Sequence, residues 1–213
     1  DFEQAIAHTG TKFRANVARR MRNLERTGPV RLVRTEEADP EWLDRFFTLE
    51  ATGWKGRQGS AIACDLTRRA YYEALAAEAA RHGYLTLYAL ECGVEPIAMH
   101  FGLTINGRYL VPKLAYDETR HEFGPGHLLI REILRDGVAR GLTEFDFLGD
   151  TAPWKREWAP AERAYYHVYI FGNNAMGRLA HAVRFRLLPT GRRIQSKLLL
   201  PFAIQSLPSS VLN

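Results

Sequence analysis

The chain has 213 residues, 46% of them hydrophobic and 25% charged, which is the composition of a folded globular protein with a sizeable core. Its apolar run at residues 198–204 contains Pro201 and is too short to cross a bilayer. Only two cysteines occur, Cys64 and Cys92, without the spacing of a metal site, which argues against bound zinc and favours a reduced, cytoplasmic setting.

The net charge of +5 is unevenly spread along the chain. Residues 12–34 contain eight Lys or Arg and one acidic residue, and residues 163–213 contain seven basic residues and no acidic one. Such segments suit nucleic acid, anionic lipid or a phosphorylated ligand, although a solvated helix face gives the same pattern. We expect the two segments to lie close together and to form a positive face for peripheral contact with an anionic surface.

The first part of the chain is predicted to be mainly helical. Apolar spacing and terminal signals indicate helices at residues 9–26, 39–54 and 65–82, with a short strand, VRLVRT, after the first. The last of these begins at Asp65, a good N-cap, and ends before Gly83. Because the chain opens on DFEQAIAHTGTKF, without an initiator Met, we expect an N-terminal portion to be missing and residues 1–30 to be a basic linking helix.

The hydrophobic period then becomes strand-like. Three short runs joined by tight turns predict an antiparallel meander, at residues 84–91, 96–104 and 108–116. The second turn contains Asn106-Gly107, a strong hairpin signal. A helix at 127–140 and a buried strand at 143–149 follow, and the crossover predicts that this strand is parallel to the one before the helix. The sequence thus predicts a mixed α/β fold of the α+β kind, in which an antiparallel meander changes to a parallel βαβ crossover flanked by helices.

The remainder of the chain continues this pattern briefly and then turns basic. Residues 163–171 predict one more strand, and residues 173–188 and 191–206 predict two basic amphipathic helices. We therefore expect a main domain at 31–172 and a basic helical extension at 173–213.

A Gly-Pro-Gly turn opens the helix that follows the meander. The first N–H groups of a helix have no partner inside it, and the helix dipole adds partial positive charge there. Glycines let another molecule approach that backbone, and a phosphate is a natural guest, although an ordinary tight turn can have the same sequence. The candidate binding residues of this turn are Phe123, Gly124, Pro125, Gly126, His127 and Leu128.

Five segments follow one another in the chain: KFRANVARRMRNLERTG (12–28), LEATGWKGRQGSAI (49–62), PIAMHFGL (96–103), FGPGHLLIREIL (123–134) and GLTEFDFLGDTAPWKREW (141–158). In this order they resemble the GNAT acetyltransferase fold. More closely, they are similar to the CelD/BcsL-type, BioF2-like acetyltransferases, which are relatives of the FemABX peptidyltransferases. Each segment alone is a modest signal, and the shared order makes the resemblance specific. The resemblance also implies a half-domain upstream of the basic helix in residues 1–30, and we expect that this half-domain is the missing portion.

The resemblance implies acetyl-CoA or another acyl-CoA as co-substrate, and no metal. The backbone N–H groups around Gly124, Gly126 and His127 are then expected to hold its diphosphate, as backbone nests do. Its pantetheine arm is expected between the strands at 108–116 and 143–149, where neighbouring parallel strands splay. Pro125 departs from the common loop pattern, and because proline lacks an N–H we expect fewer phosphate contacts.

Lys155 and Asp146 are the candidate catalytic residues. Lys155 lies in a polar connection between two tryptophans, where the resemblance implies a lysine, and its ammonium suits a phosphate or the negative charge that develops during acyl transfer. Asp146, the middle residue of FDF, is a candidate general base. A surface lysine and a structural acid are the alternatives.

The glycine-rich stretch at 53–59 is expected to be a loop between helices, and it supplies candidate acceptor-binding residues. Trp54, Lys55 and Arg57 suit a sugar or a phosphorylated acceptor, unless the loop simply links helices around a packed tryptophan. His100 falls in mid-strand and is expected in the core. No spacing suggests a Ser-His-Asp or Cys-His arrangement, so a covalent acyl-enzyme is disfavoured.

The leading hypothesis is an acyl-CoA-dependent N- or O-acyltransferase that works by direct attack in a ternary complex. Its acceptor is expected to be a small molecule or a saccharide, such as a precursor of cell-envelope polysaccharide. One alternative is a FemABX-like peptidyltransferase that uses aminoacyl-tRNA; the usual long helical-hairpin insertion is not seen, and nucleic acid is otherwise not expected as a partner. Another alternative is a non-catalytic binding module that keeps the fold.

Overall fold

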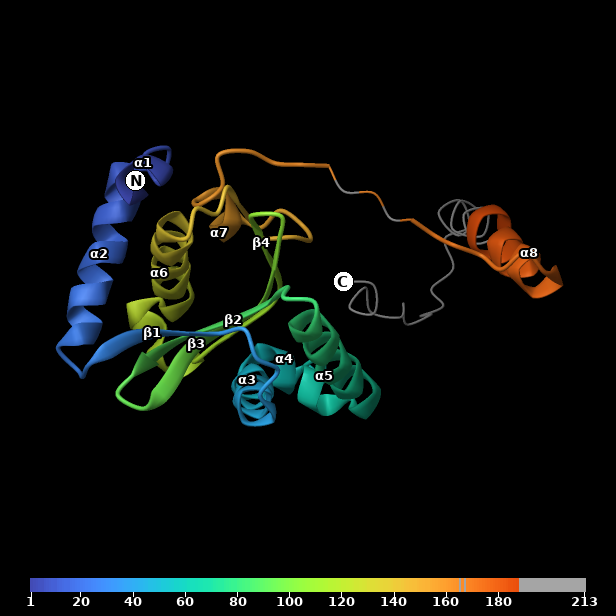
Figure 1. The fold of residues 1–213 in the computed structure, drawn as a ribbon, viewed down its shortest axis with the longest axis horizontal. Coiled ribbons are helices and arrows are strands. Elements are labelled where there is room, and N and C mark those ends of the chain that lie inside the picture. Colours follow the sequence, from blue (N-terminus) through green and yellow to red (C-terminus); the bar gives the residue numbers. More distant parts are fainter. Residues whose placement is uncertain (165, 167, 188–213) are drawn as a thin grey trace, which may run out of the picture. The chain divides into compact units, whose positions relative to one another are not determined.

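The computed structural model describes residues 1–164, 166 and 168–187, and the chain divides after Glu162 into two compact units. The first unit is built on a five-stranded sheet in the order β1-β2-β3-β4-β5 (Figure 1). β1 to β4 pair antiparallel, and β5 joins β4 in parallel, so the predicted mixed sheet is confirmed. The strands are β1 (Val30–Thr35), β2 (Leu85–Cys92), β3 (Glu95–Ile105), β4 (Arg108–Tyr116) and β5 (Glu144–Asp146).

Helices cover both faces of this sheet (Figure 1). One face carries α1 (Phe2–Ala5), α2 (Thr11–Glu25) and α6 (Pro125–Ala139), and the other carries α3 (Pro40–Thr52), α4 (Trp54–Arg57) and α5 (Leu66–Arg81). Short 3-10 turns, η1 (Ile62–Cys64) and η2 (Glu118–Phe123), precede α5 and α6, and α7 (Pro153–Arg156) follows β5.

The sheet separates two hydrophobic clusters, because strand side chains alternate between its faces. Tyr88 and Leu90 on β2 pack against α2 and α6, whereas Leu87 and Ala89 pack against α3 and α5. Every residue of β2 is buried, as expected for a strand covered on both faces.

A β-bulge interrupts the pairing of β3 with β4. Phe101 is paired with Lys113 and Leu103 with Leu110, so the single residue Gly102 lies opposite two residues of β4. A Cβ on Gly102 would overlap the ring of Tyr109, which explains why glycine occupies this position. The bulge bends β4 at the point where it leaves its parallel neighbour.

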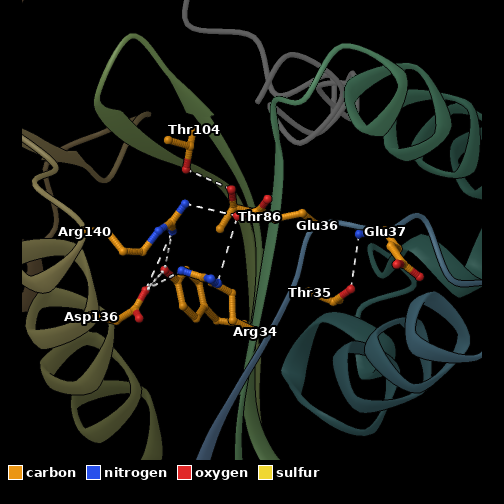
Figure 2. Close-up of polar contacts among 9 residues, drawn as sticks. Arg34, Thr35, Glu36, Glu37, Thr86, Thr104, Asp136 and Arg140 are labelled. Atoms are coloured by element: carbon orange, nitrogen blue, oxygen red, sulfur yellow. Dashed lines mark hydrogen bonds and ion pairs between the residues drawn. The ribbon is translucent and has the colours of Figure 1, made fainter.

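A polar network fastens the C-terminal half of α6 to β1 and β2. Figure 2 shows Arg34, Asp136 and Arg140 converging, with Asp136 Oδ2 lying 3.3 Å from Arg34 Nη1 and 3.7 Å from Arg140 Nη1. The hydroxyl of Tyr88 donates to the same oxygen at 2.5 Å, and Arg140 also bonds Glu36 at 3.1 Å. Burial, followed by the hydrogen bond to Asp136, raises the pKa of Tyr88.

Several predicted boundaries are corrected. The helix expected at 39–54 ends at Thr52, because Gly53 is extended, and the expected loop at 53–59 contains the helical turn α4. The strand expected at 143–149 is only Glu144–Asp146, and Leu148 and Gly149 have φ of 52° and 59°. The strand expected at 163–171 is wrong, since its described positions are in neither strand nor helix.

The second unit begins at Arg163. It contains α8 (Ala175–Ala182), which continues as a π-helical turn, η3 (Val183–Leu187), within the region predicted as the helix at 173–188. The predicted helix at 191–206 lies outside the described residues, as do three of the seven basic residues expected at this end. Across the described part of the chain, no helix is both long enough and apolar enough to span a membrane.

Candidate functional site

The parallel pairing between β4 and β5 is short. It consists of the pairs Arg108↔Glu144, Tyr109↔Phe145 and Leu110↔Asp146. β4 continues to Tyr116, and within the described chain no strand pairs with residues 111–116 on that side. The two strands therefore part after Leu110, which leaves backbone groups of β4 on an open edge. Such an edge binds an extended, amide-containing molecule by main-chain hydrogen bonds.

The start of α6 lies beside the far end of this edge. Gly124 is left-handed, with φ 62° and ψ 55°, and Pro125 is the first helical residue. The Gly124 carbonyl accepts from the N–H groups of His127 at 3.0 Å and Leu128 at 3.2 Å. Since proline has no N–H, Gly126 carries the one N–H of this turn that has no partner among the described residues.

The space in front of Gly126 is open. The nearest atom to a Cβ placed there is Tyr116 Cδ1, at 3.9 Å, in the last residue of β4. A free N–H at a helix start, an adjacent open strand edge and room for close approach together fit a diphosphate joined to an amide-containing arm. The chemistry of these donors therefore fits CoA.

The six candidate residues of the loop divide into two kinds. Leu128 is fully buried and Phe123 packs against the same hydrophobic cluster, so their side chains anchor the loop rather than face a ligand. Gly124 and Gly126 contribute backbone. Pro125 is buried and fixes the first turn of the helix.

His127 has a defined hydrogen-bonding state. Trp158 Nε1 donates to its Nδ1 at 2.9 Å, and Phe13 packs edge-on against both rings. Burial lowers the pKa of His127, and the nearby charge of Arg20 lowers it further, while Glu157 opposes the shift. His127 is therefore a neutral acceptor that ties the start of α6 to Trp158.

The two candidate catalytic residues lie near the end of β5. Lys155 Nζ donates to the carbonyls of Leu148 at 2.5 Å and Asp150 at 2.9 Å, and it lies over the Trp154 ring. Burial lowers the pKa of Lys155, and the negative charges of Asp150 and then Asp146 oppose this shift. Asp146 accepts from the Leu148 N–H at 2.8 Å, so both residues contact the same turn.

The candidate acceptor residues lie on α4, and two of the three are engaged by carboxylates. Lys55 Nζ is 2.7 Å from Glu50 Oε1, which is almost fully buried, and it also donates to the Leu114 carbonyl of β4 at 2.9 Å. Arg57 is 2.7 Å from Glu118 Oε2. Trp54 has an exposed ring, and its backbone N–H donates to the Glu118 carboxylate.

Lys113 is a candidate that the sequence reasoning missed. It lies on the open part of β4, with its ammonium 5.7 Å from the centre of the Tyr72 ring, and it forms neither a hydrogen bond nor an ion pair with any described residue. Burial lowers its pKa. The alternation that would have shown which face Lys113 occupies is broken by the bulge at 111–112, so no pattern in the sequence indicates its position. The predicted core position of His100, in contrast, is confirmed, since it is 1% exposed.

A family model described as acetyltransferase (GNAT) domain matches residues 11–156. No curated protein matches the chain. Among solved structures, the aminoglycoside acetyltransferase AAC(6')-Iy, in complex with a bisubstrate analogue of CoA, has 13% identity and a TM-score of 0.46, and the match covers 67% of this chain and 99% of that one.

A second similar structure is the aminoglycoside acetyltransferase meta-AAC0020 from an uncultured soil metagenomic sample, in complex with sisomicin. It has 16% identity and a TM-score of 0.47, with 66% of this chain and 95% of that one covered. The family match includes α2, the whole sheet and the loop at the start of α6, and it spans more than half of the chain. The chain therefore belongs to the acetyltransferase (GNAT) domain family.

Proposed function

We propose that this domain transfers an acetyl group from acetyl-CoA to an amine or hydroxyl of a small-molecule acceptor, by direct attack in a ternary complex. The observation that carries the proposal is the free Gly126 N–H next to Tyr116, where the open edge of β4 ends. The diphosphate of CoA needs an anion site, and its amide-containing arm needs a neighbouring strand edge. The start of α6 and the open edge of β4 offer the two side by side.

Acetyl-CoA, when bound, supplies an acetyl group activated as a thioester. Two of the three N–H donors of the Lys155 ammonium are used on backbone carbonyls, and we assign the third to the negative charge that develops on the acetyl oxygen. We assign the role of general base to Asp146, whose Oδ2 lies 3.8 Å from Arg108 Nη2 and would take the proton of the acceptor.

For the acceptor we favour a saccharide, as in the CelD/BcsL-type relatives that the sequence resembles. The exposed ring of Trp54 is a flat apolar surface of the kind on which a sugar packs. Lys55 and Arg57 are held by Glu50 and Glu118, so their part is to position α4 against β4 and η2.

A thermal-shift panel tests the proposal, because a ligand that binds only the folded chain raises its melting temperature. Acetyl-CoA is expected to raise it, with longer acyl-CoAs measuring the room around the acyl group. A response to tRNA alone would support the aminoacyl-tRNA alternative. No response to any acyl-CoA would refute the proposal.

A further inference from the structure

The side chain of Arg20 reaches from α2 to the loop at the start of α6. A Cβ placed on Gly124 would overlap Arg20 Nη1, and it would lie 3.4 Å from Cζ and 3.6 Å from Cδ. The guanidinium thus occupies the space that a side chain at position 124 would need. Glycine is therefore favoured at position 124 for two reasons: its φ is left-handed, and a Cβ would collide with Arg20.

Arg20 is half-buried, and its guanidinium has no hydrogen-bond acceptor among the described residues. Its Nε is inaccessible to solvent and has no hydrogen-bond partner, and across the described ranges Arg20 forms no ion pair. Leaving a buried donor unsatisfied is costly, and more so when the donor belongs to a charged group. Arg14 and Arg19 on the same helix differ in this respect, since Arg14 donates to three backbone carbonyls and Arg19 to Asn16.

The loop next to Arg20 is short of donors for an anion. Pro125 removes one N–H, Gly124 O takes those of His127 and Leu128, and only the Gly126 N–H of this turn has no partner among the described residues. The charge of Arg20 is close enough to lower the pKa of His127 in the first turn of α6. Arginine presents paired N–H donors that match phosphate oxygens, so an orphaned guanidinium at this place meets the need that Pro125 creates.

We propose that Arg20 binds the diphosphate of CoA, supplying from α2 the donors that the proline-containing loop lacks. This inference rests on the proposed use of acetyl-CoA. It makes α2, which precedes the first strand of the sheet, a part of the co-substrate site rather than only a packing element.

Calorimetric titration with CoA tests the assignment on the full chain. Arg20→Gln is expected to weaken CoA binding at least about tenfold, the effect of losing one charge-assisted contact. Arg19→Gln is the matched control, because it removes the same charge from an exposed position of the same helix. It should bind CoA like the wild type. If the wild type binds CoA and Arg20→Gln binds it equally well, the inference is wrong; if the wild type does not bind CoA, the proposed function itself fails.

Two further probes locate the contact. Dephospho-CoA keeps the diphosphate and lacks the 3′-phosphate, so Arg20→Gln should lose affinity for it by the same factor as for CoA. S-acetylpantetheine has no phosphate and should be unaffected. A loss confined to CoA would place Arg20 at the 3′-phosphate and overturn the assignment, and an equal loss for all three would mean a structural effect. Should Arg20→Gln not fold, Arg20→Lys, which keeps the charge but not the paired donors, must show the same ranking of the three probes at a smaller loss.

Discussion

The ammonium of Lys155 donates to the carbonyl oxygen of Leu148, a residue with a positive φ of 52°. A branched side chain in this conformation is strained and persists only when its surroundings hold it. Lys155 from one side and the Asp146 carboxylate, which accepts the Leu148 N–H, from the other fasten this turn at the end of β5. The two candidate catalytic residues therefore share one backbone segment.

Replacement of Lys155 by Met should lower turnover by roughly 100-fold or more, since one donor to a developing negative charge is worth about 3–4 kcal/mol in the transition state. The affinity for acetyl-CoA should fall far less. Steady-state kinetics together with calorimetry measures the two effects separately. Reduced affinity with normal turnover at saturation would assign Lys155 to phosphate binding, and wild-type values for both would remove it from the mechanism.

Replacement of Gly126 by Val should weaken CoA binding without unfolding the protein. The backbone there is helical and a Cβ meets nothing closer than 3.9 Å, so the added methyl groups occupy the space in front of the free N–H. Gly126→Ala, which adds a single carbon, should have an intermediate effect. Calorimetry checks this order, and unchanged affinity in a folded Gly126→Val variant would contradict the assignment of the loop.

His100 should make the protein less stable in mild acid. Burial lowers its pKa to about 3 from an ordinary value of 6.5, so the folded state disfavours its protonated form. The neutral side chain contributes its full stabilisation above pH 6.5, and this stabilisation is lost as the pH falls from 6.5 towards 3. At pH 5 the loss in unfolding free energy is about 2 kcal/mol. Urea unfolding at pH 7.5 and pH 5 measures the drop in unfolding free energy between the two pH values. In His100→Leu this drop should be smaller by about 2 kcal/mol. An equal loss in both proteins would mean that another group governs this range.

Replacement of Tyr88 by Phe should cost about 1 kcal/mol of unfolding free energy, the usual net value of one hydrogen bond, because Asp136 loses its hydroxyl donor. CoA affinity should not change, since the network lies at the opposite end of α6 from the loop and a helix of this length spans about 20 Å. Urea unfolding and calorimetry report the two quantities. A loss of CoA affinity in this variant would show that the two ends of α6 are coupled.

Local signals in the sequence predicted most of the sheet. The Asn106-Gly107 turn has positive φ at both residues, and Asp65 caps α5 by accepting from the N–H groups of Thr67 and Arg68, as their residue types indicate. These features are decided within a few residues, so a reading of neighbours suffices.

Features that depend on distant partners were missed. Residues 163–171 have strand-forming composition, yet Tyr166, Val168 and Ile170 are 87%, 80% and 92% exposed, because strand preference expresses fit to a sheet that is not formed there. The strand expected at 143–149 stops at Asp146, which pairs with Leu110 directly before the bulge of β4. Arg20 gave no signal among the basic residues of its helix, since only the tertiary structure shows which guanidinium lacks a partner.

The bulge in β4 acts as a phase shift in the strand's alternation. Before it, Tyr109 and Val111 face α6; after it, Leu114 and Tyr116 do, although an unbroken strand would send them to the opposite side. Deleting one residue at 111–112 would remove the extra residue and give an uninterrupted alternation, in which Leu114 and Tyr116 still face α6 and Lys113 still faces the opposite side. A single-residue deletion at the bulge should therefore be tolerated better than one within residues 113–116, where no residue is extra and the residues that follow would change faces.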